Sequence, residues 1–394
     1  MRVLLRSIRD RAADDANTVR ADEPLAFHRR LPGYWPTPLI EAPDLAKSLG
    51  VGQVLVKNET SRFDLPSFKV LGASWATYAA LAEKLGPLPD GPIAFADLRH
   101  WVSPVRPLTL IAATDGNHGR AVARVARWLG VDARIYLPNF VEPARQQAIE
   151  SEGADVVVVD GLYDASVDAA LDASNHPGTL LISDTARTSS DPIPKLVTQG
   201  YGTIFAEVDQ QLAASGDRMI DTVAIQAGVG GLSAACTGWA RSPRHSRPTQ
   251  VAVVEPETAA CVMTALAAGE PAGIAADEVS AMNVLQCGTI SLTAFETLRE
   301  GVSCCLAVED EWASTAASCL EEAGVATGLS GAAGLAGFLG ALSSPMAAAV
   351  RGHLGLTPDA QVLVVATEAP IASKHDLKVN PGVLAVTERE VELV

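Results

Sequence analysis

Residues 61–73 read Ser61-Arg62-Phe63-Asp64-Leu65-Pro66-Ser67-Phe68-Lys69-Val70-Leu71-Gly72-Ala73. Lys69 stands at the start of an alanine-rich apolar helix, between Phe68 and Val70, where a solvated lysine is unusual. An apolar pocket lowers the pKa of a lysine, and the free amine is the form that makes Schiff bases. The stretch therefore predicts a reactive lysine. The alternative is a helix lysine whose stem lies along apolar surface with its charge in water.

A second stretch, Gln226-Ala227-Gly228-Val229-Gly230-Gly231-Leu232-Ser233, follows an apolar strand and precedes an alanine-rich helix. Its glycines allow close backbone approach, and a helix N-terminus offers unpaired N–H groups to a phosphate. The turn therefore predicts a phosphate-binding loop. Two alternatives stay open. One is a tight turn that only requires glycine, and the other is a dinucleotide-binding turn with Glu255 as the ribose-binding acid.

A third stretch, Ala113-Thr114-Asp115-Gly116-Asn117-His118-Gly119-Arg120, also joins a strand to a helix. The side-chain amide of Asn117 can donate to a phenolate or a carboxylate, and neighbouring backbone N–H groups can hold an anion. We therefore expect a binding turn. Taken alone, Asp115 is more typical of a helix N-cap.

Short β-branched runs alternate with helical segments along the chain, which indicates an α/β fold with mostly parallel sheets flanked by helices. The predicted strands cover residues 53–56, 108–112, 133–137, 155–159, 180–183, 222–226, 250–254 and 361–366. Apolar residues on one face predict a helix over 119–129 that ends at Gly130. The uncharged stretch 331–350 predicts one buried, close-packed helix rather than a membrane span. The strands form two clusters, so we expect two sheets with a cleft between them.

Composition and charge narrow the classes of partner. The formal net charge is −16 and no basic stripe compensates for it, so neither nucleic acid nor a membrane is an expected partner. The six cysteines show no CxxC spacing, which predicts reduced thiols and no metal site. No apolar segment follows the arginines near the N-terminus, so we expect no signal peptide and a cytoplasmic protein.

Together, in this order and at these separations, the three stretches resemble the fold-type II pyridoxal-phosphate (PLP) enzymes, the tryptophan synthase β-like group that includes the serine and threonine dehydratases. The resemblance covers most of the chain. Residues 68–74, 113–120 and 181–186 (Leu181-Ile182-Ser183-Asp184-Thr185-Ala186) are most similar to the diaminopropionate ammonia-lyase family. The resemblance implies a homodimer and two lobes. Residues 1–71 and 201–394 would form the large PLP-binding domain, and residues 72–200 the small inserted α/β domain.

The resemblance also implies roles for single residues. Lys69 would carry PLP as a Schiff base beside Phe68, and Asn117 would contact the phenolic oxygen of the cofactor. Thr367 would face the pyridine nitrogen, which a hydroxyl partner leaves unprotonated. The phosphate would lie on the loop formed by Gly228, Val229, Gly230, Gly231 and Leu232.

The implied reaction is α,β-elimination on 2,3-diaminopropionate, a small amino acid, to give pyruvate and ammonia. Lys69 would remove the Cα proton of one enantiomer and Asp115 that of the other, while Asp184 binds the β-amino group. Taken alone, Asp184 is equally typical of a cap at a strand end.

The chain departs from the family's pattern at Arg187, at Ala369 and in residues 328–332. Because Arg187 would change the charge near the pocket, elimination or replacement of another β-substituent is one alternative. A nicotinamide-dependent dehydrogenase that uses the Gly228 turn is another. A non-catalytic ligand sensor on the same scaffold is a third.

Overall fold

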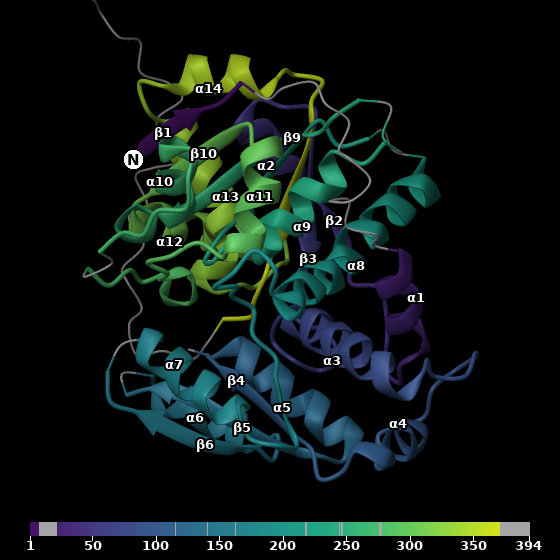
Figure 1. Cartoon of the computed structure of the whole chain (residues 1–394). Coiled ribbons are helices and arrows are strands. Elements are labelled where there is room, and N and C mark those ends of the chain that lie inside the picture. The colour runs from purple at the N-terminus through teal and green to yellow at the C-terminus, as the bar shows by residue number, and fades with distance from the viewer. Residues whose placement is uncertain are drawn as a thin grey trace, which may run out of the picture.

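The computed structural model describes residues 1–7, 22–114, 116–139, 141–161, 163–216, 219–243, 245, 247–275 and 278–370. Figure 1 shows two α/β parts, with the larger sheet in the upper one and the smaller sheet in the lower one.

The larger sheet has seven strands in the order β1-β10-β9-β8-β11-β3-β2. Its five inner strands are parallel, and the two edge strands, β1 and β2, are antiparallel to their neighbours. Its strands are β1 (Arg2–Leu5), β2 (Leu39–Glu41), β3 (Gln53–Asn58), β8 (Thr222–Gln226), β9 (Gln250–Pro256), β10 (Cys304–Val308) and β11 (Gln361–Ala366).

The smaller sheet has four parallel strands in the order β6-β5-β4-β7. They are β4 (Thr109–Ala113), β5 (Asp132–Pro138), β6 (Asp155–Val159) and β7 (Thr179–Leu181). These findings confirm the predicted fold class. The boundaries predicted for the two domains stay a prediction.

The described helices cover both sheets. They are α1 (Asp22–Arg30), α2 (Pro43–Leu49), α3 (Lys69–Leu85), α4 (Phe95–Trp101), α5 (Asn117–Leu129), α6 (Pro143–Glu150), α7 (Tyr163–Ser174), α8 (Pro192–Ser215), α9 (Gly231–Ala240), α10 (Cys261–Ala268), α11 (Leu292–Gly301), α12 (Asp310–Glu322), α13 (Leu329–Leu342) and α14 (Ala347–Leu354). Short 3-10 turns cover Ser103–Val105, Glu257–Ala259 and Asn283–Leu285.

The larger sheet is buried on both faces. Along β8, Val223 and Ile225 belong to the apolar cluster that contains α9, whereas Ala224 between them belongs to the cluster that contains α13. This alternation follows from the two-residue period of a strand. The continuous apolar runs that predicted these strands are therefore explained by helices on both sides.

All eight predicted strand ranges fall on strands of the structure, whereas β1, β2 and β10 were not predicted. The helix predicted over 119–129 is α5, and Gly130 ends it in a left-handed conformation with φ 62°. The single helix predicted over 331–350 is wrong. The structure has α13 and α14 there, separated around Pro345, because proline lacks the N–H that a continuing helix requires.

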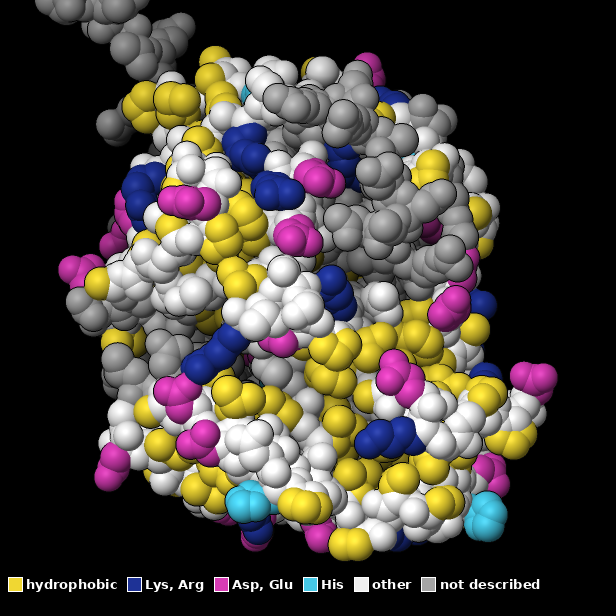
Figure 2. Space-filling view, viewed as in Figure 1, with side chains coloured by type: hydrophobic (Ala, Val, Ile, Leu, Met, Phe, Trp, Pro, Cys, Tyr) yellow, Lys and Arg dark blue, Asp and Glu magenta, His cyan; other side chains and the backbone are white. Residues whose placement is uncertain are grey.

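No helix in the described ranges is long and apolar enough to cross a membrane. Acidic and basic side chains are interspersed over the face of the molecule seen in Figure 2.

The two sheets present the carboxyl ends of neighbouring strands to one region. β3, β11 and β8 are adjacent in the larger sheet, and β4 and β7 are adjacent in the smaller one. The segments that follow these five strands contain the stretches singled out in the sequence. Ligands of open α/β sheets bind beyond such strand ends, so the fold itself places the site there.

Helices α3 and α8 pack unusually closely beside this region. A Cβ atom on Gly200 of α8 would lie 2.4 Å from the carbonyl oxygen of Leu71 and 2.8 Å from the Cα atom of Gly72. Glycine in a helix interior costs about 1 kcal/mol relative to alanine. The close approach of the two helices explains why glycine stands at both positions.

We expect Gly200→Ala to lower the free energy of unfolding by about 3 kcal/mol, because the added methyl group meets the backbone of α3. The matched control is Gly352→Ala in α14, where an added Cβ has no atom within 4 Å. We expect this change to raise stability by about 0.5–1 kcal/mol. Urea unfolding of both variants measures the difference, and equal stabilities would contradict the packing argument.

Candidate active site

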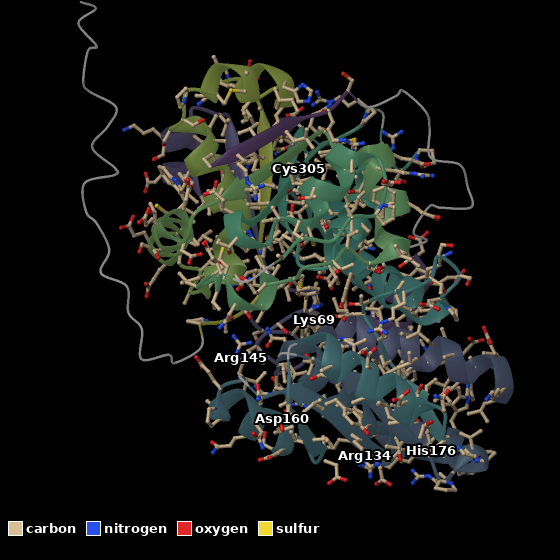
Figure 3. The ribbon with its side chains drawn as sticks, turned by 60° about the vertical axis from the view of Figure 1, so that its left-hand side comes forward. Lys69, Arg134, Arg145, Asp160, His176 and Cys305 are labelled. Atoms are coloured by element: carbon tan, nitrogen blue, oxygen red, sulfur yellow. The ribbon has the colours of Figure 1, made fainter. Side chains whose placement is uncertain are left out.

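Lys69 is the first residue of α3 and lies between the two sheets (Figure 3). Its Nζ atom is 3.0 Å from Oδ2 of Asp184, which follows β7 of the smaller sheet. The same atom lies 5.6 Å from the ring centroid of Phe68 and 5.8 Å from that of Tyr201. The lysine thus has an aromatic wall on one side and a carboxylate in front of it.

Asp184 is an ionised carboxylate in a half-buried position. Burial alone would raise the pKa of Asp184, but the charge of Lys69 outweighs this effect and holds the pKa well below its usual range. His118 lies behind it, with Nδ1 3.9 Å from Oδ2 of Asp184. Nε2 of His118 is 2.7 Å from the carbonyl oxygen of Ile182, and burial lowers the pKa of this histidine. His118 is therefore neutral, with its hydrogen on Nε2.

The glycine turn forms a tight concave loop. Gly230, with φ 100°, precedes α9, which begins at Gly231, so the first N–H groups of α9 face the pocket. A Cβ atom on Gly228 would lie 3.1 Å from Sγ of Cys287, and one on Gly230 would lie 3.1 Å from Cδ1 of Leu298. Backbone alone fits this space, which is the geometry that a phosphate site requires.

Thr367 follows β11 and is held by Gln226 at the end of β8. Nε2 of Gln226 donates to Oγ1 of Thr367 at 2.9 Å and to the carbonyl oxygen of Gly331 at 2.9 Å. Because Oγ1 accepts this hydrogen bond, the hydroxyl hydrogen of Thr367 is left to point toward an acceptor in the pocket.

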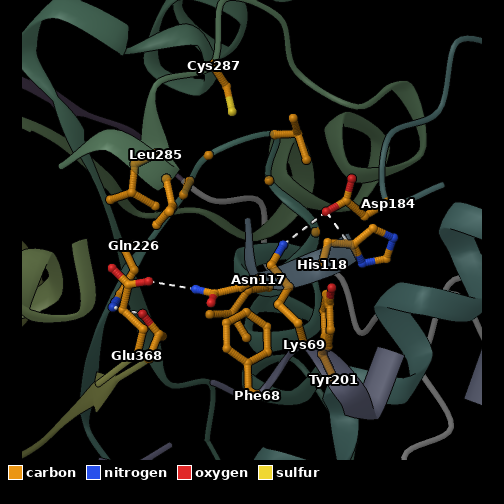
Figure 4. Close-up of a pocket in the computed structure, with 18 of the residues that line it drawn as sticks. Phe68, Lys69, Asn117, His118, Asp184, Tyr201, Gln226, Leu285, Cys287 and Glu368 are labelled. Carbon is orange, nitrogen blue, oxygen red and sulfur yellow. Dashed lines mark hydrogen bonds and ion pairs between the residues drawn. The ribbon is translucent and has the colours of Figure 1, made fainter. Parts of the chain in front are cut away.

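Asn117 begins α5 on the opposite side. Its Nδ2 atom donates to Oε2 of Glu368 at 2.6 Å. An amide nitrogen carries two hydrogens, so one remains for a ligand oxygen. Figure 4 shows Asn117, Gln226 and Glu368 on one side of the pocket, with Asp184 and His118 on the other.

These groups line one cavity with about 880 Å³ of empty space, part of it open to solvent. The predicted site residues that line it are Phe68, Lys69, Asn117, Asp184, Gly228, Val229, Gly230, Gly231, Leu232 and Thr367. The structure thus brings together residues that lie as far apart in sequence as Phe68 and Thr367. Asp115 lies outside the described residues.

Two other residues weighed in the sequence lie elsewhere. Arg187 does not line the cavity, because its Nη1 atom pairs with Oδ1 of Asp168 on α7 at 2.6 Å. The expectation that Arg187 changes the charge near the pocket stays a prediction. The carboxylate of Glu255 accepts hydrogen bonds from the backbone N–H groups of Val262 and Met263 at 2.7 and 2.8 Å. Glu255 therefore caps the N-terminus of α10, and this use of both oxygens does not suit a ribose-binding role.

Among the other polar residues of the cavity, sequence reasoning gave no role to His118, Tyr201, Gln226 and Glu368. Three of them stand inside or beside the quoted stretches, and their position next to a strand end was a usable signal. Tyr201 lies inside a long helix, and only its two glycine neighbours, Gly200 and Gly202, mark it in the sequence.

A network of four buried charges fixes the segment that leads into Lys69. Nζ of Lys57 pairs with Oε2 of Glu207 at 2.7 Å. The guanidinium of Arg62 pairs with Glu207 at 2.7 Å and with Glu59 at 2.6 Å. All four side chains are at most 1% exposed. The network joins β3 and the segment before α3 to helix α8.

The cavity fits pyridoxal phosphate. The glycine turn and the start of α9 suit its phosphate, Thr367 can donate to a ring nitrogen, and Asn117 can donate to a phenolic oxygen. Buried polar atoms that have no hydrogen-bond partner in the described structure, Oε1 of Gln226 and the hydroxyl of Tyr201, belong to residues that line the same cavity. Such atoms in a native pocket indicate that a polar ligand belongs there.

Comparison with known proteins agrees with this fit. The model of a family described as pyridoxal-phosphate dependent enzyme matches residues 30–368. The chain therefore belongs to the family of pyridoxal-phosphate-dependent enzymes, and its cofactor is pyridoxal phosphate.

Within this family the chain belongs with the diaminopropionate ammonia-lyases. It is 32% identical over 354 residues to the diaminopropionate ammonia-lyase of Escherichia coli K12, which covers 89% of this chain and 88% of that protein. It is also 32% identical over 356 residues to the Salmonella typhimurium enzyme, with 88% of each chain covered. The resemblance stated from the sequence is confirmed.

Solved structures give the same result. The E. coli diaminopropionate ammonia-lyase in its holo form superposes with a TM-score of 0.84 at 29% identity, covering 93% of each chain. Its complex with an aminoacrylate-PLP azomethine reaction intermediate gives a TM-score of 0.82 at 29% identity, over 93% of this chain and 94% of that one. A threonine deaminase from Solanum lycopersicum, at 22% identity and a TM-score of 0.72 over 94% of each chain, shares the fold.

We expect Glu207→Gln to lower the free energy of unfolding by about 3–5 kcal/mol, because it leaves Lys57 and Arg62 buried with one carboxylate between them. The control is Asp155→Asn, which removes an exposed partner of Arg134 at 3.6 Å and is expected to cost less than about 1 kcal/mol. Denaturant unfolding of the two variants compares these costs. If the Glu207→Gln protein were as stable as the Asp155→Asn protein, the buried charge network would make no contribution to the free energy of unfolding.

Proposed function

We propose that the chain is an ammonia-lyase that carries out α,β-elimination on 2,3-diaminopropionate and yields pyruvate and ammonia. The observation that carries this proposal is the half-buried carboxylate of Asp184, which is held ionised 3.0 Å from the amine of Lys69. An anion beside a reactive lysine suits a substrate with a second ammonium group. The named relatives of the chain are ammonia-lyases for this substrate.

Pyridoxal phosphate, when bound, withdraws electrons from Cα of the amino acid and so makes the Cα proton removable. The residues that would hold it are Lys69 through its amine, residues 228–232 at the phosphate, Asn117 at the phenolic oxygen and Thr367 at the ring nitrogen. Phe68 would lie beside it.

Asp184 would exchange one cation for another. In the structure its partner is the ammonium of Lys69. Once the lysine amine is engaged elsewhere, this carboxylate has lost its counter-ion, and the β-ammonium of the substrate replaces it. A buried carboxylate with no counter-ion is costly, so the site favours a substrate that brings a positive charge.

Two groups would share the removal of the Cα proton. The neutral amine of Lys69 accepts it from one enantiomer, and the carboxylate of Asp115 accepts it from the other. The Cβ–N bond then breaks, its electron pair leaves on ammonia, and the 2-aminoacrylate that results hydrolyses to pyruvate and a second ammonia.

We also propose that the enzyme works as a homodimer in the cytoplasm and divides into the two predicted domains. Five of its six cysteines are buried, and all six are free thiols, which suits a reducing compartment. Light scattering after gel filtration measures the mass: a mass near 41.0 kDa would contradict the dimer.

The test is a product assay with separate D- and L-2,3-diaminopropionate. We expect two ammonia per pyruvate, a ratio that elimination from serine or cysteine does not give. We expect Lys69→Ala to lose about 1000-fold or more in rate, and Asp115→Asn to lose activity on one enantiomer only. We expect Asp184→Asn to weaken binding of both enantiomers.

The control is Lys195→Ala, an exposed lysine of α8. Borohydride reduction of the holoenzyme followed by peptide mass spectrometry is expected to find the cofactor on the peptide that contains Lys69 in the control as in the wild type. Cofactor bound at Lys69 without pyruvate from either enantiomer would overturn the proposed substrate and leave the cofactor site in place.

A further inference from the structure

The hydroxyl of Tyr201 is a buried polar group with an unexplained position. Tyr201 lines the cofactor cavity and is only 1% exposed. Its hydroxyl has no hydrogen bond of ordinary geometry within the described part of the chain, although the Lys69 ammonium is near enough to act on it through its charge and a weak hydrogen bond. A buried hydroxyl without a hydrogen-bond partner destabilises the fold, so a hydroxyl at this position in the cavity indicates a functional role.

The ring of Tyr201 is held rigidly from three sides. A Cβ on Gly72 would lie 2.5 Å from Cε1 of the ring, and one on Gly231 would lie 3.6 Å from Cε2. The ring of Phe68 meets it edge-on, with centroids 4.8 Å apart and an interplanar angle of 71°. The hydroxyl therefore has a fixed position, which is what a group that acts on a reacting atom requires.

Tyr201 lies on the same side of the cavity as Asp184 (Figure 4). Burial raises the pKa of Tyr201 well above its usual range, the charge of Lys69 opposes this shift, and the charge of Asp184 adds to it. The hydroxyl therefore keeps its proton at every working pH and acts as a hydrogen-bond donor. Nζ of Lys69 lies 5.8 Å from the centroid of the Tyr201 ring, and Lys69, Asp184 and Tyr201 line the same cavity, so Tyr201 lies near the two groups that would surround the β-nitrogen.

We propose that Tyr201 is a further catalytic residue, whose hydroxyl donates a hydrogen bond to the nitrogen that leaves Cβ. This inference rests on the proposed function. An ammonium nitrogen has no free electron pair, so the substrate in its ground state offers Tyr201 nothing to bind. As the Cβ–N bond breaks, the bonding pair passes to nitrogen and the Cα electron pair forms the Cα=Cβ bond. The new lone pair at first points at Cβ, and it accepts the hydrogen bond as ammonia turns away from Cβ.

Asp184 and Tyr201 would have different roles, because the β-nitrogen is an ammonium before the reaction and ammonia after it. Asp184 accepts hydrogen bonds from the ammonium before the reaction, and so contributes to binding. Tyr201 interacts with the nitrogen only after the bond has begun to break, and an interaction that the bound substrate does not make raises kcat without lowering KM. Asp184 would thus hold the leaving group, and Tyr201 would assist its departure.

The test is Tyr201→Phe in the holoenzyme with 2,3-diaminopropionate. We expect kcat to fall about 10- to 100-fold, as for the loss of one hydrogen bond in the transition state, and KM to change less than about 2-fold. We expect the β-nitrogen ¹⁵N isotope effect to rise and the α-deuterium isotope effect to fall, because cleavage of the Cβ–N bond becomes slower. With β-chloroalanine, whose chloride leaves without assistance, we expect less than about a 3-fold loss.

The controls separate this role from structural support. Phenylalanine keeps the ring contacts and removes an unpartnered group, so we expect the melting temperature and the cofactor dissociation constant of Tyr201→Phe to equal or improve on those of the wild type. Tyr78→Phe, on the far part of α3 and outside the cavity lining, is expected to change nothing.

Three results would overturn the proposal. They are an unchanged kcat, an equal loss for both substrates, or weaker binding of the cofactor by Tyr201→Phe. A wild-type enzyme that releases no ammonia from 2,3-diaminopropionate overturns the proposed function as well, whereas an active wild type with an unaffected Tyr201→Phe variant overturns this inference alone.

Discussion

The constraint on which the site depends is the burial of four charges, Lys57, Glu59, Arg62 and Glu207, in one place. Each of them alone would be prohibitively costly away from water, so they are stable only together and only in one geometry. Arg62 stands seven residues before Lys69, and Glu207 stands six residues after Tyr201 on α8. The network therefore fixes the reactive lysine and the tyrosine relative to each other, although more than 100 residues separate them.

The same segment is also tied to the smaller sheet. Phe63 and Asp64 both adopt left-handed backbone conformations, with φ 54° and 59°, which non-glycine residues rarely do. Arg124 on α5 donates to the carbonyl oxygen of Phe63 at 2.8 Å, and Glu152 holds the guanidinium of Arg124 at 2.6 Å. The structure thus holds a strained segment in place from both sides, and the position of Lys69 depends on contacts with both sheets.

Sequence patterns predicted the structural features that depend on residues adjacent in the chain. The glycine turn before α9 and the apolar surroundings of Lys69 were readable because the backbone conformation and the helix start impose residue types locally. Most apolar strands were predicted, but the apolar strand β10 was missed, as was β2, whose three residues offer only a short pattern. The assignment to diaminopropionate came from resemblance and not from any pattern of charge.

What the sequence did not reveal are contacts between distant segments. Gln226 reaches Thr367 across 141 positions, and Asn117 reaches Glu368 across 251. The pairing of Arg187 with Asp168 was not predicted for the same reason, since Asp168 lies on a helix whose direction no local pattern fixes. The side chains that position the cofactor-binding groups are therefore the part of the site that required the structure.

The neutral state of His118 determines which cation can pair with Asp184. Its Nε2–H donates to the carbonyl oxygen of Ile182, and burial lowers its pKa, so that it adds no charge beside Asp184. A cationic histidine 3.9 Å away would serve as a permanent counter-ion and would compete with a substrate ammonium for the carboxylate. With a neutral histidine, Asp184 relies on whichever amine is nearest. That amine is Lys69 in the resting protein and the β-amine of the substrate in the proposed reaction, so the carboxylate would select substrates that carry a second cation.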